Sequence, residues 1–296
     1  MTAQIIDGAK IAADIRNRVK QEAADLKAQR GIVPGLATVL VGDNPASHAY
    51  VRSKRKACAE LGLASFGHEL AKETTQAEVI ALVRLLSGDP QVHGILVQLP
   101  LPAHISEEAV LSEVALEKDV DGFNPINIGK LGMKNRMPSF APCTPSGVIE
   151  LLDRCGAKIE GAHAVVLGRS NIVGLPVSLL LLGRNATVTV CHSRTQDIAA
   201  VTRQADILVA AIGKTRFVTA GMVKPGAVVI DVGINEVPDA TKRSGKRLVG
   251  DVDFDGVKEV AGAITPVPGG VGPMTIAMLM QNTLTAAKSR AVGSKE

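Results

Sequence analysis

Helical periodicity and short apolar runs alternate along the first half of the chain. Apolar positions recur every three or four residues over about residues 9–30, 45–61 and 75–87, which predicts three helices that each pack one face. Shorter runs with the residue types of strands lie between them, at residues 35–42, 63–70 and 92–99. Because parallel strands need long crossover connections, this alternation predicts a mostly parallel sheet covered by helices.

The second half starts a new series of strands. Its apolar runs have the length of strands buried on both faces, and they cover residues 162–168, 186–193, 206–213, 227–233 and 248–252. This spacing predicts a doubly wound α/β fold. The last apolar segment, residues 275–290, is expected to form a helix whose face of Ile276, Met280 and Leu284 needs an apolar surface, and it could return to the first domain.

The two series are separated by residues 119–147, a segment rich in glycine, proline and asparagine that is typical of a passage between domains. A chain of 296 residues also exceeds the usual size of one domain. We therefore predict two α/β domains, one formed by residues 1–142 with 276–296 and the other by residues 143–275.

One lysine lies on the apolar side of its predicted helix. Asn-Pro before residues 45–61 and Leu-Gly at their end are start and stop signals. At about 100° per residue, Lys54 falls on the apolar arc with Tyr50. The cations on the other side are Arg52, Arg55 and Lys56. Lys54 is either a stem that packs on the core while its ammonium reaches water, or an ammonium placed in a cleft for proton transfer.

A tight turn between a strand and a helix is predicted in VVLGRSNIVGLP, residues 165–176. Its Gly168, Ser170 and Gly174 give a G-x-S-x-x-x-G spacing, which departs from the usual dinucleotide fingerprint, so a plain turn is the alternative. The turn stands at the head of a new series of strands. That position favours a site where a dinucleotide pyrophosphate rests on helix N-terminal amides.

The end of the next strand indicates which dinucleotide this site prefers. NAD-specific sites have an acidic residue about 20 positions after the turn, but Cys191, His192, Ser193 and Arg194 stand there. Arg194, with Arg169, can pair with a 2′-phosphate to which Ser193 can donate, so the pattern favours NADP. The alternative is an exposed arginine after a strand.

Three further segments have both a functional and a structural interpretation. Gln98 ends a strand, at the edge where open parallel sheets bind ligands, or it fixes the following loop. Asp121 can bind a ligand or serve an ordinary Asp-Gly turn. PGGVGPMTI, residues 268–276, lets backbone approach a ligand closely, or acts as a hinge.

Composition disfavours several classes of protein. Hydrophobic residues make up 46% of the chain and aromatic residues only 2%, which predicts an aliphatic core and few platforms for stacking bases. The net charge of +4 is mild and spread along the chain, so nucleic acid is a poor candidate partner. The four cysteines have no metal-ligand spacing, so we expect reduced thiols and no metal: Cys58, Cys143, Cys155 and Cys191.

The N-terminus and the apolar clusters bear on location. The first ten residues fit neither a secretory signal nor a basic transit peptide. The longest apolar clusters, such as residues 175–183, are too short to span a bilayer. We therefore expect a cytoplasmic protein that does not enter a membrane.

Together these segments resemble the bifunctional methylenetetrahydrofolate dehydrogenase/methenyltetrahydrofolate cyclohydrolase family over nearly the whole chain. The segments that carry the resemblance are IIDGAKIA, VGDNPASHAYVRSKRKAC, VHGILVQLPLP, KDVDGFNPINIGKL, PCTPSG, VVLGRSNIVGLP, IDVGIN, LVGDVDF and PGGVGPMTI. Ser87, in LSGDP, stands where the family usually has asparagine. The resemblance implies an N-terminal α/β catalytic domain, a Rossmann-like NADP-binding domain, a cleft between them for a tetrahydrofolate derivative, and usually a homodimer joined through the cofactor domains.

The resemblance also implies roles for single residues. Tyr50 would stack on the folate, Lys54 would be the catalytic lysine, Gln98 would hydrogen-bond near it, and Asp121 would hold the pterin ring. Residues that match family positions around NADP are Gly168, Arg169, Ser170, Ser193 and Ile234. Residues in the family loop beside the substrate are Gly272, Pro273 and Thr275. The implied reactions are NADP-dependent oxidation of 5,10-methylenetetrahydrofolate and hydrolysis of the methenyl product to 10-formyltetrahydrofolate, within the one-carbon metabolism that serves purine biosynthesis.

Three rival functions are disfavoured by the sequence. Short-chain dehydrogenases also use Tyr-x-x-x-Lys, but their glycine-rich turn precedes that pair, whereas Gly168 follows Lys54 by more than a hundred residues here. A catalytically silent NADP- or folate-binding protein would not need Lys54, Gln98 and Asp121 together. A nucleic-acid binder that uses the basic residues 52–56 would be retained on DNA in a salt-dependent way.

Overall fold

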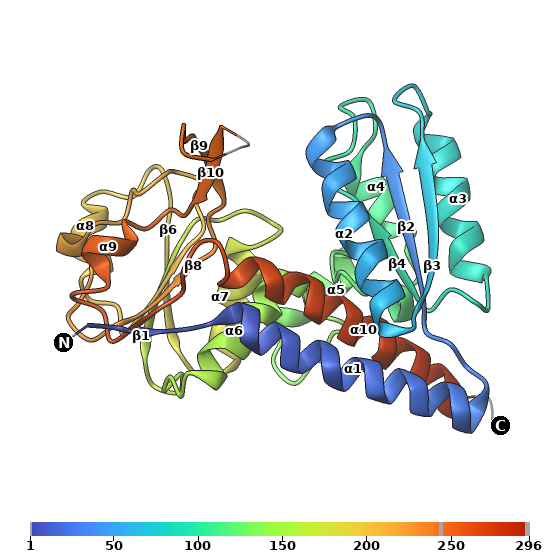
Figure 1. Cartoon of the computed structure of the whole chain (residues 1–296), viewed down its shortest axis with the longest axis horizontal. Coiled ribbons are helices and arrows are strands. Elements are labelled where there is room, and N and C mark those ends of the chain that lie inside the picture. Colours follow the sequence, from blue (N-terminus) through green and yellow to red (C-terminus); the bar gives the residue numbers. More distant parts are fainter. Residues whose placement is uncertain (1, 243–244, 294–296) are drawn as a thin grey trace. The chain divides into compact units, whose positions relative to one another are not determined.

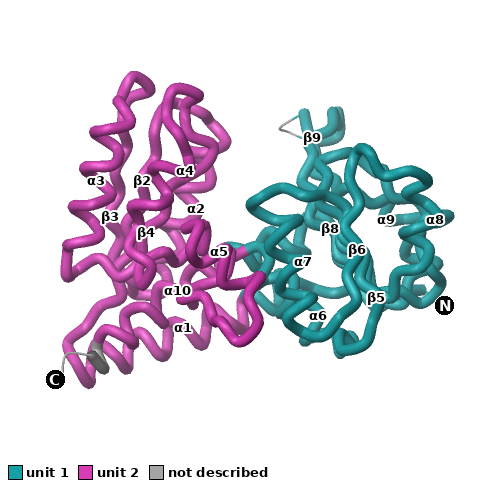
Figure 2. Tube along the Cα trace, turned by 180° about the vertical axis from the view of Figure 1, so that it is seen from behind, with its two compact units in different colours: residues 1–12, 144–275 teal, residues 13–143, 276–296 magenta. Residues whose placement is uncertain are grey.

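The computed structural model describes residues 2–242 and 245–293. Their internal contacts divide the chain into two compact units, which Figure 2 colours separately. Unit 1 contains residues 1–12 and 144–275, and unit 2 contains residues 13–143 and 276–296. The chain passes from one unit to the other within helices α1 (Gly8–Arg30) and α10 (Val271–Gly293), and at the start of α6 (Cys143–Arg154).

Unit 2 is built on a parallel sheet of three strands in the order β3-β2-β4, counted over the described residues. Its remaining elements, in chain order, are β2 (Gly35–Val41), α2 (Pro45–Leu61), β3 (Ala64–Leu70), α3 (Gln76–Gly88), β4 (Gly94–Val97), α4 (Glu107–Ser112), η1 (Leu116–Lys118) and α5 (Pro125–Leu131). Helices α2 and α3 lie on opposite sides of the sheet (Figure 1). All seven residues of β2 are buried, because both faces of the central strand are covered.

Local signals in the sequence explain the bounds of helix α2. The side chain of Asn44 accepts hydrogen bonds from the first turn, and Pro45 occupies the first helical position, where no amide hydrogen bond is lost. Gly62 ends the helix in a left-handed conformation, with φ of 75°, that glycine adopts without steric cost. The start and stop signals in the sequence therefore predicted this helix correctly.

Arg55 lies on the side of α2 away from Lys54, but it is only partly exposed. Its guanidinium covers Gly67 of β3 so closely that a side chain at Gly67 would collide with it. Its Nη1 also forms an ion pair of 2.8 Å with Glu69 Oε1. The helical wheel placed Arg55 opposite Lys54, but only the packing of α2 on β3 reveals this contact.

Unit 1 is built on a parallel sheet of six strands in the order β1-β11-β8-β7-β5-β6, again over the described residues. Its elements, besides α6 and parts of α1 and α10, are β1 (Gln4–Ile5), β5 (His163–Leu167), α7 (Gly174–Gly183), β6 (Thr187–Cys191), α8 (Ile198–Thr202), β7 (Ile207–Ala210), η2 (Ala220–Met222), β8 (Val228–Asp231), β9 (Asn235–Pro238), β10 (Lys246–Val249), α9 (Phe254–Val257) and β11 (Ala263–Ile264). This is the doubly wound α/β pattern that the alternating strands predicted.

The first residues of the chain group with unit 1, whereas the sequence pattern predicts them in the first domain. Strand β1 pairs in parallel with β11, through Gln4 beside Ala263 and Ile5 beside Ile264. A two-residue strand carries too little periodicity to be recognised, and its pairing with a strand far along the chain cannot be read from local sequence. The two units divide the chain at residues 12, 143 and 275.

Two other segments contain more helix than expected. The segment 119–147 is not only a loop, because helix α5 lies within it and α6 begins at Cys143. Helix α10 begins at Val271, so Gly272, Pro273 and Thr275 lie in its first turns and not in the preceding loop. Met280 and Leu284 of this helix are completely buried, as its apolar face predicted.

Candidate active site

Lys54 is buried on the inner face of helix α2. Only 8% of its surface is exposed, and Val51, Ala57 and Cys58 on the same face are buried as well. Its Nζ donates a hydrogen bond of 2.9 Å to Oε1 of Gln98. The ammonium therefore does not reach out to water past a packed stem. Since a buried charge is costly unless it is hydrogen-bonded, Gln98 is a necessary partner of Lys54.

Gln98 follows directly after strand β4, at the carboxyl end of the sheet in unit 2. Its backbone N–H donates to Val39 O at 2.8 Å, which continues the pairing with β2. Its side-chain Nε2 donates to Leu99 O at 2.7 Å, so the carbonyl oxygen faces Lys54. Gln98 thus fixes the loop after the strand and also orients the lysine, which combines both interpretations of this residue.

Asp121 is partly buried and lies close enough to Lys54 for their charges to interact. Burial raises the pKa of its carboxyl, while the charge of Lys54 and a hydrogen bond from the thiol of Cys143 act in the opposite direction. Structure thus brings together Lys54, Gln98 and Asp121, three residues singled out separately from the sequence. Their grouping provides an ammonium, an amide and a carboxyl in one partly desolvated place.

Cys143 belongs to this group, although the sequence analysis treated it only as a thiol. It is buried, its Sγ donates to Val120 O at 3.3 Å, and burial raises its pKa well above the usual value. Asn282 of helix α10 donates to the same carbonyl oxygen at 2.9 Å. A thiol kept protonated has one hydrogen, which it can donate either to Val120 O or to Asp121, and it is a poor nucleophile. The only signal in the sequence was its place in PCTPSG.

Tyr50 stands one helical turn before Lys54 on α2. Its side chain is 49% exposed, so the ring is available to a flat ligand, unlike the buried residues of the same helix. Aromatic rings prefer to stack on such ligands or meet them edge to face. Tyr50 and Lys54 together present an exposed aromatic surface beside a buried ammonium.

In unit 1, the turn after β5 approaches its neighbours too closely for a side chain at two positions. Gly168 has φ of 116°, and a Cβ there would collide with the carbonyl oxygen of Ala211. A Cβ at Gly174 would collide with the carbonyl of Gly168. The Oγ of Ser170 accepts hydrogen bonds from Val173 N at 3.2 Å and Gly174 N at 3.3 Å. The G-x-S-x-x-x-G spacing therefore builds a compact turn that ends in the N-terminus of α7.

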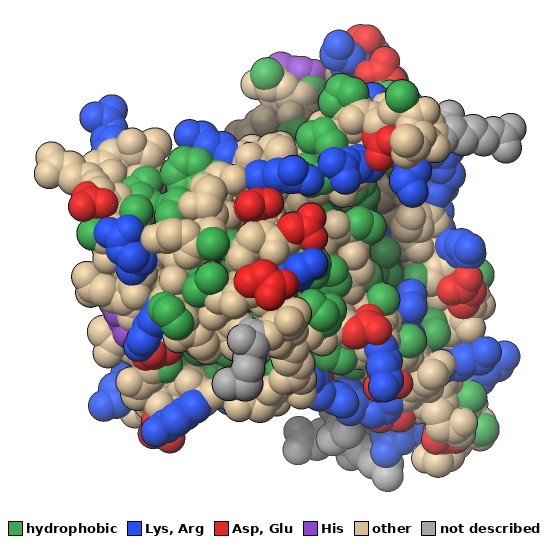
Figure 3. Space-filling model, turned by 60° about the vertical axis from the view of Figure 1, so that its left-hand side comes forward, with side chains coloured by type: hydrophobic (Ala, Val, Ile, Leu, Met, Phe, Trp, Pro, Cys, Tyr) green, Lys and Arg blue, Asp and Glu red, His purple; other side chains and the backbone are tan. Residues whose placement is uncertain are grey.

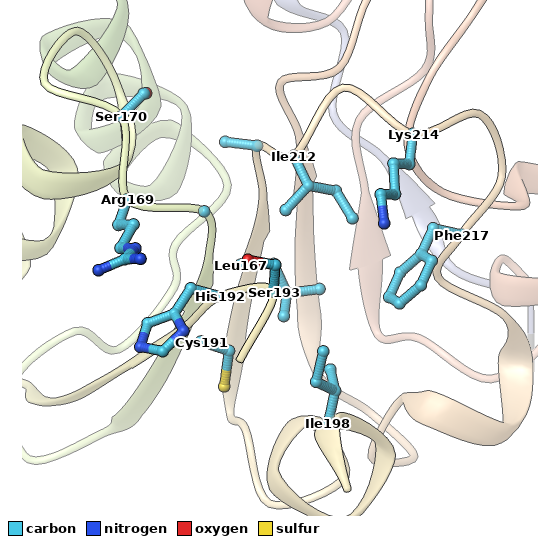
Figure 4. Close-up of a pocket in the computed structure, with 12 residues that line it drawn as sticks. Leu167, Arg169, Ser170, Cys191, His192, Ser193, Ile198, Ile212, Lys214 and Phe217 are labelled. Atoms are coloured by element: carbon cyan, nitrogen blue, oxygen red, sulfur yellow. The ribbon is translucent and has the colours of Figure 1, made fainter. Parts of the chain in front are cut away.

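A pocket of about 290 Å³ opens beside this turn (Figure 4). Its lining consists of Leu167, Gly168, Arg169, Ser170, Cys191, His192, Ser193, Ile198, Ala211, Ile212, Lys214 and Phe217. Figure 4 shows Arg169 and His192 on one side and Lys214 with Phe217 on the other. The pocket lies at the carboxyl ends of β5, β6 and β7, where doubly wound sheets bind nucleotides.

Four predicted cofactor residues line this pocket and two do not. Arg194 is exposed, does not line the pocket, and donates its backbone N–H to His192 Nδ1 at 3.2 Å. Ile234 is 48% exposed and lies close to the backbone of Gly272. Lys214 was missed because it stands in a loop after a strand with no motif around it. The residues in the pocket are Gly168, Arg169, Ser170 and Ser193.

The predicted substrate loop is fixed at the start of α10. Thr275 shares a hydrogen bond of 2.9 Å with the hydroxyl of Thr144. Gly272 has Ile234 as its nearest neighbour, at 3.8 Å from the position of a Cβ, so a small side chain would fill the space between them. These contacts bring together in unit 1 two motifs that are separate in the sequence, IDVGIN with Ile234 and PGGVGPMTI with Gly272 and Thr275.

Other kinds of site find no support among the described residues. Within 2–242 and 245–293, no three His, Cys, Asp or Glu side chains are grouped as metal ligands. No described helix is long and apolar enough to cross a membrane. On the face that Figure 3 draws, basic and acidic side chains are interspersed, which is not the continuous basic surface that binds nucleic acid.

Comparison with known proteins accounts for both units. The family model for the tetrahydrofolate dehydrogenase/cyclohydrolase catalytic domain matches residues 6–121, and that for the NAD(P)-binding domain of the same enzymes matches residues 142–291. The bifunctional protein FolD 2 of Arabidopsis thaliana is 58% identical over 97% of this chain and 96% of its own length. The bifunctional protein FolD of Moorella thermoacetica is also 58% identical, over 97% of this chain and all of its own.

Solved structures agree. A bifunctional FolD methylenetetrahydrofolate dehydrogenase/cyclohydrolase from Campylobacter jejuni is 48% identical, covers 97% of this chain and 99% of its own, and has a TM-score of 0.91. The Trypanosoma brucei enzyme, solved with NADP cofactor and an inhibitor, is 46% identical over 98% of this chain and 99% of its own, with a TM-score of 0.93. This chain belongs to the tetrahydrofolate dehydrogenase/cyclohydrolase family.

Proposed function

We propose that this protein is a bifunctional one-carbon folate enzyme. It oxidises 5,10-methylenetetrahydrofolate with NADP to the methenyl cation, and then hydrolyses that cation to 10-formyltetrahydrofolate. The observation that carries this proposal is the buried ammonium of Lys54, held at 2.9 Å by Gln98 and close to Asp121, in a chain that also has a nucleotide pocket. The bifunctional relatives, whose lengths this chain spans almost completely, support both reactions.

The pocket of unit 1 fits NADP. Its glycine turn leaves room for backbone to approach a pyrophosphate, and the N-terminus of α7 lies beside it. Arg169 and Ser193 line the pocket and provide a guanidinium and a hydroxyl for a 2′-phosphate. NADP, when bound, accepts the hydride. Ile234 and Gly272 lie together at the start of α10 and bound the place for its reactive ring.

Lys54 moves the proton in the hydrolysis. Water adds to the methenyl carbon and one of its protons passes to Nζ of Lys54, which accepts it as a neutral amine. The remaining hydroxyl proton moves to the departing nitrogen as one C–N bond opens to leave the formyl group. Gln98 Oε1 accepts from Nζ and so keeps the ammonium oriented. Hydride transfer asks less of Lys54, because it depends mainly on holding two ligands face to face.

Asp121 and Tyr50 hold the folate. A carboxylate can accept hydrogen bonds from the amino and ring N–H groups of a pterin, and the partial burial of Asp121, which raises its pKa, strengthens such bonds. The exposed ring of Tyr50 stacks on the flat part of the substrate. Gly272, Pro273 and Thr275 line the substrate from the first turns of α10. Unit 2 accordingly contributes Tyr50, Lys54, Gln98 and Asp121 to folate binding, whereas unit 1 contains the NADP pocket together with Gly272, Pro273 and Thr275.

The protein forms a homodimer through unit 1. Helix α7 exposes apolar side chains in a row, with Leu175 40% exposed and Leu182 57% exposed, and Ile172 before the helix is 46% exposed. Strand β6, which contacts α7, ends the sheet, so its outer edge pairs with no other described strand. Exposed edges and apolar rows are usually covered. A second copy covers both, and Leu182→Glu should therefore give a monomer in light scattering.

A cytoplasmic location completes the proposal. All four cysteines are free, and three of them are buried. Free thiols in a protein of this size are typical of a reducing compartment.

The decisive experiment is a spectrophotometric assay of the purified chain with methylenetetrahydrofolate and either NADP or NAD. We expect NADPH formation, followed by disappearance of the methenyl absorbance as the cation is hydrolysed. Binding of NADP and folate by the folded chain without turnover would instead identify a silent binding protein.

A further inference from the structure

We propose that Lys214 binds the adenine of the nucleotide, and that Asp251 is the positioning residue that holds Lys214 in place. The proposal rests on the nucleotide pocket of the proposed function and adds a residue that the sequence motifs did not indicate. It separates two tasks within the pocket. Arg169 and Ser193 distinguish NADP from NAD, whereas Lys214 binds the part that both cofactors share.

The loop that carries Lys214 is fixed at its start by a buried carboxylate. Oδ2 of Asp251 accepts hydrogen bonds from Ile212 N at 2.7 Å and Gly213 N at 2.9 Å. Its Oδ1 accepts from Nδ2 of Asn235 at 3.0 Å. Asp251 is completely buried, so these bonds are not in competition with water. The carboxylate therefore determines where the chain leaves strand β7.

The end of the loop is fixed by the backbone around Asp251. Val218 pairs with Val252 in an isolated parallel bridge, with Val218 N donating to Asp251 O at 2.9 Å and Asp253 N donating to Val218 O at 2.8 Å. Asp231 accepts from the N–H groups of Asp251 and Val252, at 2.9 Å each, and so holds this segment against the sheet. Both ends of the loop consequently depend on one short segment, LVGDVDF.

Between these anchors the backbone takes an unusual path. Gly213 has φ of 65° and Arg216 has φ of 50°, a conformation that costs a residue with a side chain about 1 kcal/mol or more. Such strain persists only where surrounding contacts determine the path, and it is concentrated at binding sites. The result is that Lys214 and Phe217 both line the pocket, with Nζ of Lys214 5.6 Å from the centre of the Phe217 ring.

The chemistry of this wall matches adenine. Around the ammonium of Lys214 the lining is apolar, formed by Ile198, Ile212 and Phe217 (Figure 4). Adenine has a flat apolar ring system whose nitrogens accept hydrogen bonds, so it needs apolar walls and a well-placed donor. Arg169 lies on the opposite side of the pocket in Figure 4, together with His192. The two cations are therefore aimed at different parts of one ligand.

The test uses two nucleotide fragments that differ by one phosphate. 2′,5′-ADP and 5′-AMP both contain adenine, but only the first has the 2′-phosphate. Each fragment is titrated against the protein with NADPH bound, and the displacement of NADPH is measured by the change in its fluorescence. Lys214→Met should weaken both fragments by the same factor, about tenfold. Arg169→Ala should weaken 2′,5′-ADP alone. Lys158→Met is the matched control. This exposed lysine precedes strand β5 and so lies at the amino ends of the strands, away from the pocket at their carboxyl ends.

The outcomes are distinct. If Lys214→Met weakens only 2′,5′-ADP, Lys214 binds the 2′-phosphate and the proposal is wrong. If it weakens neither fragment, Lys214 does not bind the nucleotide. Failure of the unmodified protein to bind NADPH would instead overturn the nucleotide pocket, and with it the proposed function.

The positioning role of Asp251 is tested by coupling. Asp251→Asn retains a carbonyl oxygen but loses the charge that holds Ile212 and Gly213. We expect it to weaken both fragments, and to add little once Lys214 is already Met, because the two changes act on the same contact. Arg216→Gly is a second variant at an exposed position. Glycine adopts the positive φ without strain, but its wider conformational freedom leaves the loop less fixed before binding, so both fragments should weaken about twofold to threefold. Effects of Asp251→Asn and Lys214→Met that simply add, or no effect of Arg216→Gly, would contradict the role.

Discussion

The two units place a lysine next to apolar side chains in opposite ways. In unit 2, Lys54 projects from a capped helix, is 8% exposed, and donates to the side chain of Gln98. In unit 1, Lys214 projects from an exposed loop, and its ammonium lies over an aromatic ring at the mouth of a pocket. A proton carrier benefits from a dry and fixed position, because both increase the interaction with a reacting group. A nucleotide ligand must enter from water, so an open pocket with a fixed loop is sufficient.

The buried carboxylates behind the two sites are alike. In unit 2, Asp119 accepts hydrogen bonds from Phe123 N, Asn124 N and Asn127 Nδ2, and so fixes the segment after Asp121. In unit 1, Asp231 accepts from three backbone N–H groups. Burial raises the pKa of each to about 6. Each unit thus uses a buried aspartate to hold loops, and the two units differ in the side chains that those loops carry.

The largest effect is expected at the buried lysine. Lys54→Gln should reduce the rate of methenyltetrahydrofolate hydrolysis by about 10²-fold to 10⁴-fold, because it removes the proposed proton carrier, while NADP-dependent oxidation survives in part. Hydrolysis of the methenyl cation is followed by absorbance, with oxidation measured alongside. Arg52→Gln and Lys56→Gln are matched controls on the exposed side of the same helix, and should change turnover only slightly. If the folded Lys54→Gln variant hydrolyses the methenyl cation at the wild-type rate, Lys54 is not the proton carrier.

The next effect concerns the carboxyl near that lysine. Asp121→Ala should raise the KM for methylenetetrahydrofolate by about ten to a hundredfold and leave NADP binding almost unchanged, because Asp121 belongs to unit 2 and NADP binds in unit 1. Steady-state kinetics for each substrate measure the two effects. Equal losses for folate and NADP, or loss of the fold by circular dichroism, would mark Asp121 as a turn residue.

A change of cofactor preference is expected in unit 1. Arg169→Ala should reduce the preference for NADP over NAD by roughly ten to a hundredfold, since a charge-assisted pair is lost. Arg194→Ala should have a smaller effect, because that side chain is exposed and does not line the pocket. The ratio of kcat/KM for the two cofactors gives the result. A larger effect of Arg194→Ala than of Arg169→Ala would instead identify Arg194 as the arginine that binds the 2′-phosphate, as the sequence pattern favours.

The smallest effect is on stability, and it tests whether burial raises the pKa of Asp119, as it does for Asp231 in unit 1. The folded-state pKa of Asp119 is raised from 3.8 to about 6, so its contribution to stability is fully present below 3.8 and is lost as pH rises through 6. The free energy of unfolding that Asp119→Asn removes should therefore be larger near pH 4.5 than near pH 7.5, by about 2 kcal/mol at most. Urea unfolding of both proteins at each pH measures it, and surface carboxylates cancel in the difference. A pH-independent difference would contradict the raised pKa.

The sequence by itself determined much of the local structure and singled out many residues of the candidate sites. Asn44, Pro45 and Gly62 bound helix α2, because caps act through neighbouring backbone groups. The position of Lys54 on the apolar face followed from helical geometry alone. Gly168 and Gly174 marked the turn of the pocket, since their spacing reports a close backbone approach.

Tertiary structure decided the rest, because it depends on residues far apart in the chain. Strand β1 joins unit 1 through pairing with β11, some 260 residues later, which no local pattern contains. Cys143 enters the lysine site only because α6 begins beside Val120. Lys214 lines the nucleotide pocket because Asp251 fixes its loop, whereas the hydrogen-bonded turn after β6 leaves Arg194 exposed and outside the pocket. Periodicity and capping are local properties, whereas the direction of a loop side chain is set by whichever distant groups bind its backbone.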